Sequence, residues 1–128
     1  MQNENNPLSP HLQIYKWQIS SLLSITHRIV GVINFLAINL ICLWFITLQF
    51  GQDFYEEINF FLNTIIGKFC IVSLCWTFSF HILNEIRHLI WDAGFGFELK
   101  TAKITGVLVL ISSFLLTIIF YILGRSLI

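Results

Sequence analysis

Four ionisable side chains share one face of an expected helix near residues 81–92. His81, Glu85, His88 and Asp92 follow one another at steps of four, three and four residues, which places them on the same side of an α-helix. The stretch follows an apolar run and carries Arg87 beside this face. Ionisable groups within a membrane helix are costly and usually mark a functional site. The interpretation of this stretch therefore depends on whether its helix lies in a membrane.

The composition indicates a membrane protein. Of the 128 residues, 56% are hydrophobic and only 11% are charged, whereas soluble domains carry roughly a quarter charged residues. The formal net charge is zero, which argues against a nucleic-acid partner. The three cysteines lie inside apolar runs without a CxxC pair and are interpreted as packing residues. We expect an all-α membrane protein.

Three apolar stretches predict three transmembrane helices, at about 24–50, 63–91 and 104–124. The first contains the uncharged run 29–50, which at about 1.5 Å per residue is long enough to cross a hydrocarbon core of about 30 Å. Residues 51–57 and 92–103 hold glycines and charged residues, and we expect both to be loops. The chain is then a single membrane-anchor domain, 1–128, whose residues 1–20 form a polar segment at the membrane surface.

Basic residues near the spans predict the orientation. Lys16 and Arg28 flank the start of the first span and Lys100 and Lys103 lie in the second loop, whereas the first loop is acidic. The positive-inside rule puts the N-terminus and the second loop on the cytoplasmic or matrix side. The start of the first span and the end of the second then share that membrane face. A polar side of the first span is expected to meet the 81–92 face there, and it consists of Ser20, Ser24, His27, Arg28 and Gly31.

Two chemistries suit such a site. A membrane histidine can ligate haem iron, and His81 lies deepest, although it could equally be a structural hydrogen-bonding residue. His81 and His88 cannot ligate one haem together, because seven residues separate them by roughly 10 Å along a helix. Ser24 and Arg28 offer a hydroxyl and a cation beside lipid, which suits a quinone. Alternatively, Ser24 bonds its own helix and Arg28 reaches lipid phosphates.

Three motifs of this chain closely resemble a known family. They are Pro-Leu-Ser-Pro-His-Leu-Gln-Ile-Tyr at 7–15, Ser-Ile-Thr-His-Arg-Ile-Val-Gly at 24–31, and His81 followed by Ile-Arg-His-Leu-Ile-Trp-Asp at 86–92. In this order, on a three-span chain of this length, they resemble the cytochrome b large membrane-anchor subunit of succinate dehydrogenase, respiratory complex II. The resemblance covers essentially the whole sequence.

The resemblance implies a fold and a set of partners. Three transmembrane helices would pack with a second small anchor subunit, beneath an iron–sulfur subunit and a flavoprotein subunit. Electrons from succinate would pass through the iron–sulfur subunit to ubiquinone. The chain has no flavin motif and no cysteine framework for clusters, so we expect it to be non-catalytic alone. Residues 1–10 show no cleavable signal, and the expected location is the bacterial plasma membrane or the mitochondrial inner membrane.

The resemblance also implies roles for single residues. His81 would be the axial ligand of haem b from this chain, with the other ligand from a partner subunit. His27 and Arg28 would hold the haem propionates, and His88 is a further cofactor-binding candidate. Ser24 and Arg28 would belong to the quinone site.

Three positions depart from the family pattern. Glu85 stands where the family has glycine, one turn from the haem histidine, and we expect Arg28 or Arg87 to pair with its carboxylate. Asn6 and Trp17 replace a common arginine and a common proline.

The alternative functions are a haem-less structural anchor of the same complex and an anchor of a fumarate reductase. An unrelated small membrane protein is a third alternative, which the three motifs in their order disfavour.

Overall fold

The computed structural model describes residues 17–49 and 52–127, and within this part of the chain all regular structure is helical. The four helices are α1 (Ile19–Thr47), α2 (Gln52–Asn63), α3 (Ile65–Asp92) and α4 (Leu99–Leu127). Helices α1, α3 and α4 are long and apolar enough to cross a membrane. The predicted all-α architecture with three spanning helices is therefore confirmed. The surface segment expected at residues 1–16 lies outside the described residues.

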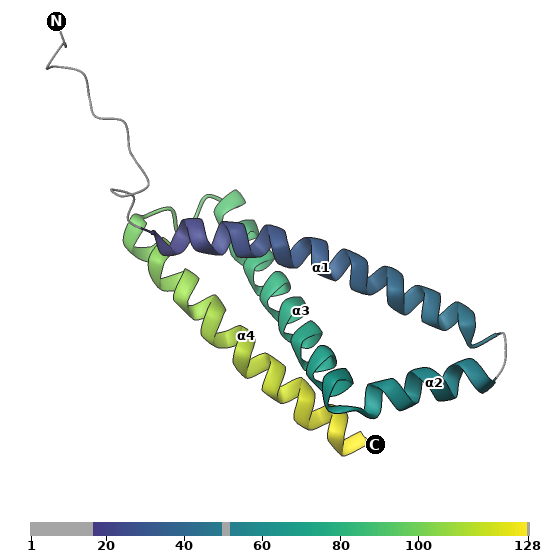
Figure 1. The fold of residues 1–128 in the computed structure, drawn as a ribbon. Helices are drawn as coiled ribbons and strands as arrows, with labels where there is room; N and C mark the ends of the chain where they lie inside the picture. The colour runs from purple at the N-terminus through teal and green to yellow at the C-terminus, as the bar shows by residue number, and fades with distance from the viewer. Residues whose placement is uncertain (1–16, 50–51, 128) are drawn as a thin grey trace, which may run out of the picture.

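Helix α2 corrects the expected first loop. Glycine and acidic residues at 51–57 suggested a loop, but a helix begins at Gln52. Glutamate is compatible with a helix, and Ile58 and Leu62, four residues apart, are half-buried on one side of it. α2 ends at a tight turn where the Thr64 hydroxyl caps α3 by accepting a hydrogen bond from the Gly67 amide at 3.1 Å. Figure 1 shows α2 joining the far ends of α1 and α3.

α3 packs against both other long helices, along α4 and against the first half of α1 (Figure 1). The core is small, with Leu23, Val30, Phe80 and Val109 buried together. Most other large apolar side chains are exposed, for example Phe35 at 66%. In a chain with spanning helices these side chains face lipid or partner subunits.

Small and hydroxyl-bearing residues line the contact between α3 and α4. Ser79, Ser113 and Thr117 are buried, and their hydroxyls donate to carbonyl groups of their own helices at 2.7 Å. Such residues let helices approach closely in lipid. The turn that joins the two helices contains Gly94 and Gly96 at φ of +90° and +81°, a backbone conformation that favours glycine.

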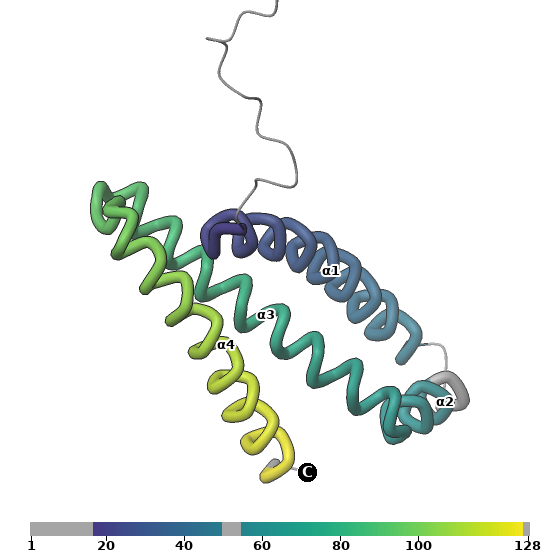
Figure 2. The backbone as a smooth tube through the Cα atoms, turned by 60° about the vertical axis from the view of Figure 1, so that its left-hand side comes forward, coloured from purple at the N-terminus to yellow at the C-terminus, as the bar shows by residue number. Residues whose placement is uncertain are grey.

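The first turns of α1 lie beside the C-terminal end of α3 and the start of α4. Figures 1 and 2 agree on this arrangement from directions 60° apart. It is also seen in side-chain contacts, because a Cβ at Gly106 of α4 would lie 2.5 Å from Leu23 Cδ1 of α1. The polar start of the first span and the polar end of the second therefore meet at one end of the bundle, as the predicted topology requires.

Candidate functional site

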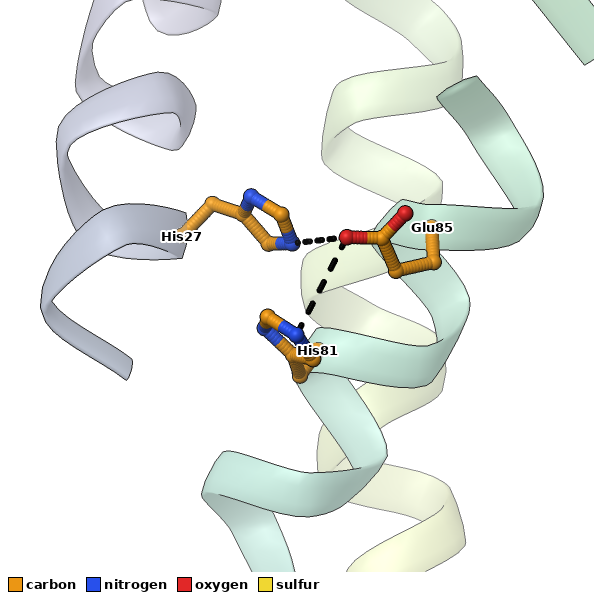
Figure 3. A group of neighbouring side chains, drawn as sticks. All are labelled: His27, His81 and Glu85. Atoms are coloured by element: carbon orange, nitrogen blue, oxygen red, sulfur yellow. Dashed lines mark ion pairs between the residues drawn. The ribbon is translucent and has the colours of Figure 1, made fainter. Parts of the chain in front are cut away.

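Three ionisable side chains converge between α1 and α3. His27 comes from the third turn of α1, and His81 and Glu85 come from consecutive turns of α3 (Figure 3). His27 Nε2 lies 3.0 Å from Glu85 Oε1, and His81 Nε2 lies 3.9 Å from the same oxygen. The two imidazole rings stack with centroids 4.3 Å apart and an angle of 13° between planes. The predicted meeting of the two polar patches is thus present.

The close contact between His27 and Glu85 lacks the angles of a hydrogen bond. His27 Nε2 is buried, but no hydrogen bond with acceptable angles reaches it from any described residue, and the same holds for His81 Nδ1. Buried ring nitrogens without such a partner are uncommon. Both imidazoles therefore keep coordinating capacity that the chain itself does not use.

Gly31 allows the approach of α1 to His81. A Cβ at this position would lie 3.3 Å from His81 Cε1 and 4.0 Å from His81 Nδ1. A separation of 3.3 Å is tighter than an ordinary contact, so a larger residue would displace the imidazole. The absence of a side chain at Gly31 thus helps set the position of His81.

His88 lies one step further toward the end of α3. Its ring centroid is 5.7 Å from that of His27 and 5.1 Å from that of Trp91, with an edge-to-face arrangement in the second contact. The three histidines therefore form one continuous aromatic group. His88 is half-buried and lies at its outer edge.

Arg87 does not pair with Glu85, and this corrects the expected ion pair. Its guanidinium is buried, donates to Ala102 O at 2.8 Å and Thr105 Oγ1 at 3.1 Å, and covers the Trp91 ring at 4.1 Å. Arg28 makes no ion pair with Glu85 either among the described residues. Residue spacing on α3 alone could not show this, because the two closest acceptors of Arg87 lie on α4.

Ser24 and Arg28 lie on a flank of α1 next to His27. They are four residues apart, so they share a side of the helix, and both are exposed. Within the described ranges neither side chain makes a hydrogen bond or an ion pair. Ser24 therefore does not bond its own helix, in contrast to Thr26, whose hydroxyl donates to Leu22 O at 2.9 Å. The Ser24 hydroxyl is free to bind a ligand.

The donor set fits one axial ligand of a haem. Imidazole is a common ligand of haem iron, His81 Nδ1 has no hydrogen-bond partner in the described chain, and Gly31 leaves the opposing helix without a side chain. Glu85 stands beside Nε2, but its side chain is 51% exposed and can turn outward. The sequence predicted these residues but not the contact between His27 and Glu85. The one feature of the sequence that pointed to it is a carboxylate in a histidine-rich stretch.

Comparison with known proteins gives consistent matches. Residues 2–120 match the family described as succinate dehydrogenase/fumarate reductase transmembrane subunit. The chain is similar to the succinate dehydrogenase cytochrome b556 subunit of Rickettsia felis, with 42% identity over 116 residues, which cover 91% of this chain and 90% of that protein. It is also similar to the cytochrome b560 subunits of Reclinomonas americana, at 38% over 126 residues (94% and 88% covered), and Marchantia polymorpha, at 36% over 115 residues (83% and 81% covered).

Proposed function

The chain belongs to the transmembrane-subunit family of succinate dehydrogenase and fumarate reductase and is a multi-pass membrane anchor of succinate dehydrogenase; on that premise we propose that it binds haem b and forms part of a ubiquinone-reduction site. The observation that carries this proposal is the convergence of His27 and His81 from two spanning helices, with rings stacked 4.3 Å apart. The relatives named cytochrome b subunits support a haem, and the exposed Ser24–Arg28 pair beside the histidines supports a quinone.

His81 is the proposed axial ligand, and a partner subunit supplies the second ligand. A bound haem would supply a one-electron acceptor between the iron–sulfur subunit and the membrane. His27, Arg28 and His88 lie at the end of the bundle where propionates would leave the lipid, and we assign them to the propionates. Gly31 keeps α1 close enough for His27 and His81 to lie in contact.

Ser24 and Arg28 are the proposed quinone-binding residues. A quinone carbonyl needs hydrogen-bond donors while its tail stays in lipid, and an exposed hydroxyl and an exposed guanidinium on one side of α1 meet that need. These groups bind and orient the quinone. Electrons from succinate reach it through the flavoprotein and iron–sulfur subunits.

The partners and orientation follow from the same assignment. The exposed apolar surfaces of α1 and α4 suit a bilayer and a second small anchor subunit. From the positive-inside rule we assign the start of α1 and the turn between α3 and α4 to the cytoplasmic or matrix side, where the iron–sulfur subunit would bind. The membrane is a bacterial plasma membrane or a mitochondrial inner membrane, because the similar proteins come from both kinds of source.

One observation favours a second candidate, an anchor of the same complex without haem. The Glu85 carboxylate lies 3.9 Å from His81 Nε2, one of the two ring nitrogens by which this histidine could ligate iron. A fumarate reductase anchor is the other alternative, because the matched family covers both enzymes. In each case the three spanning helices would keep the same role.

A reduced-minus-oxidised absorption spectrum of the purified complex tests the proposal. The wild type is expected to show a b-type band that is absent in His81→Ala and retained in His88→Ala, the matched histidine at the edge of the group. Co-purification of the hydrophilic subunits verifies assembly of each variant. A wild-type complex without the band would favour the haem-less anchor.

A further inference from the structure

We propose that His27, His81 and Glu85 form a site for a divalent transition-metal ion of the zinc class, which is filled when the chain lacks haem b. The inference rests on the proposed function in one respect. Haem iron and the divalent ion both require the His81 imidazole, so only one of them is bound at a time.

The donor atoms are spaced for one small ion. No two of the three ligand atoms lie more than 4.8 Å apart, and the two nitrogens lie 3.0 and 3.9 Å from the shared carboxylate oxygen. Tetrahedral zinc with bonds of about 2.0–2.1 Å places its ligand atoms about 3.4 Å from one another. The two nitrogen–oxygen distances lie on either side of that value, and rotation of the stacked imidazole rings about χ2 would turn both nitrogen lone pairs toward the ion.

The donor chemistry selects the kind of ion. Two imidazoles and one carboxylate suit Zn²⁺ and other late first-row metals, whereas Ca²⁺ and Mg²⁺ require several oxygen ligands. His81 and Glu85 are four residues apart on α3 and therefore present their donors on one face. Three protein ligands leave a fourth position for water, for a partner residue or for a lipid-soluble ligand.

The helices that carry the two histidine ligands are packed together before an ion binds. Val30 of α1, three residues after His27, is 3% exposed, and Phe80 of α3, directly before His81, is 0% exposed. The His27 and His81 rings already lie in contact. Because His27 Nε2 has no hydrogen-bond partner among the described residues, coordination by this atom need not break a hydrogen bond. The carboxylate that faces both imidazoles would gain a positive partner.

The experiment uses the whole purified complex from cells deficient in haem synthesis. Bound zinc is measured by mass spectrometry after equilibration at fixed free Zn²⁺, and Co²⁺ serves as a spectroscopic probe of the ligands. Glu85→Gln removes one ligand at similar size, and His27→Gln removes another. Asp92→Asn is the matched control, since Asp92 is an exposed carboxylate on the same helix.

The wild type is expected to bind one more zinc per complex than Glu85→Gln, and Asp92→Asn to match the wild type. The Kd for zinc should rise at least about 10- to 100-fold in Glu85→Gln and His27→Gln, since loss of an outer-shell partner alone has that effect. The visible Co²⁺ band should be absent in both variants. Equal zinc in wild type and Glu85→Gln would overturn the proposal.

The haem band recorded from haem-supplied cells separates this inference from the proposed function. If the haem-free complex binds zinc but the complex from haem-supplied cells shows no haem band, the zinc site stands and the haem assignment fails. If the haem band is present but the haem-free complex binds no zinc, the haem assignment stands and the zinc site fails. If the complex assembles only with haem, excess Zn²⁺ during haem-limited growth should lower haem content in the wild type and not in Glu85→Gln. Equal haem content in the two would also overturn the proposal.

Discussion

His27 Nε2 of α1 lies 3.0 Å from Glu85 Oε1 of α3, and this contact joins two spanning helices through ionisable groups. The same oxygen lies 3.9 Å from His81 Nε2, so one carboxylate faces both imidazoles of the proposed haem site. Ionisable groups within a membrane are costly, and mutual contact reduces that cost. Glu85 is therefore the residue by which this chain most directly alters the surroundings of His81.

Removal of the Glu85 carboxylate should raise the reduction potential of haem b. A nearby negative charge stabilises the oxidised, more positive form of the haem, by roughly 1–2 kcal/mol for a Glu85 carboxylate that turns outward to about 10 Å from the iron, at an effective dielectric constant of about 20. That corresponds to an increase of about 40–90 mV for a one-electron couple in Glu85→Gln. Potentiometric titration of the b-type band measures it. An unchanged or lower potential would show that the carboxylate carries no charge near the haem.

Gly31→Val should abolish or strongly reduce haem binding. Even a Cβ would lie 3.3 Å from His81 Cε1, and the two further methyl groups of valine would displace the imidazole. Haem per assembled complex, determined from the b-type band, is the measurement. Gly124→Val is the matched control, because a Cβ there would meet no atom within 4 Å. Full haem content in Gly31→Val would mean that α1 and His81 are not in contact in the assembled complex.

The part of the site that lies along one helix could be predicted from the sequence. The spacing of His81, Glu85 and His88 placed them on one face, and the alternation of three spans brought the start of the first, which carries His27, to the same end of the bundle. The partners of charged groups could not be predicted in this way. Arg87 binds Ala102 and Thr105, and that choice depends on the packing of α3 against α4, which helical periodicity does not contain.

The fold shows the same division. Long uncharged runs determine spanning helices because the backbone must satisfy its hydrogen bonds internally in lipid, so α1, α3 and α4 were predictable. Helix α2 is short and contains acidic residues, and its apolar side, which includes Ile58 and Leu62, covers only a few turns. The acidic residues in its first turns suggested a loop, whereas its apolar residues and the lack of glycine and proline within 52–63 are compatible with a helix.

Ser24→Ala should weaken ubiquinone binding and leave the haem spectrum unchanged. The Ser24 hydroxyl is exposed and has no hydrogen-bond partner among the described residues, so its loss removes one donor to the quinone. A hydrogen bond of about 0.5–1.5 kcal/mol corresponds to a KM for ubiquinone that is roughly 2- to 10-fold higher. Thr26→Ala is the control, because that hydroxyl is bonded to Leu22 O. Succinate-to-dye activity should be equal in both, and an unchanged KM would remove Ser24 from the quinone site.

Arg87→Met should destabilise the anchor by separating α4 from α3. The guanidinium is 6% exposed and donates to Ala102 O at 2.8 Å and Thr105 Oγ1 at 3.1 Å. Methionine fills similar space but leaves both oxygens without this donor, which corresponds to about 3–6 kcal/mol for two hydrogen bonds from a charged group.

The measurement for Arg87 is the temperature at which the purified complex loses its b-type band and its quinone reductase activity. Arg87→Met should lose both at a lower temperature than the wild type, whereas Lys103→Met, which removes an exposed cation near the start of the same helix, should not. Arg87→Lys should lose them at an intermediate temperature, because an ammonium group retains the charge but lacks the planar guanidinium that donates to both acceptors. If Arg87→Met instead kept wild-type stability and lost only haem, the guanidinium would bind a propionate in the complex rather than α4.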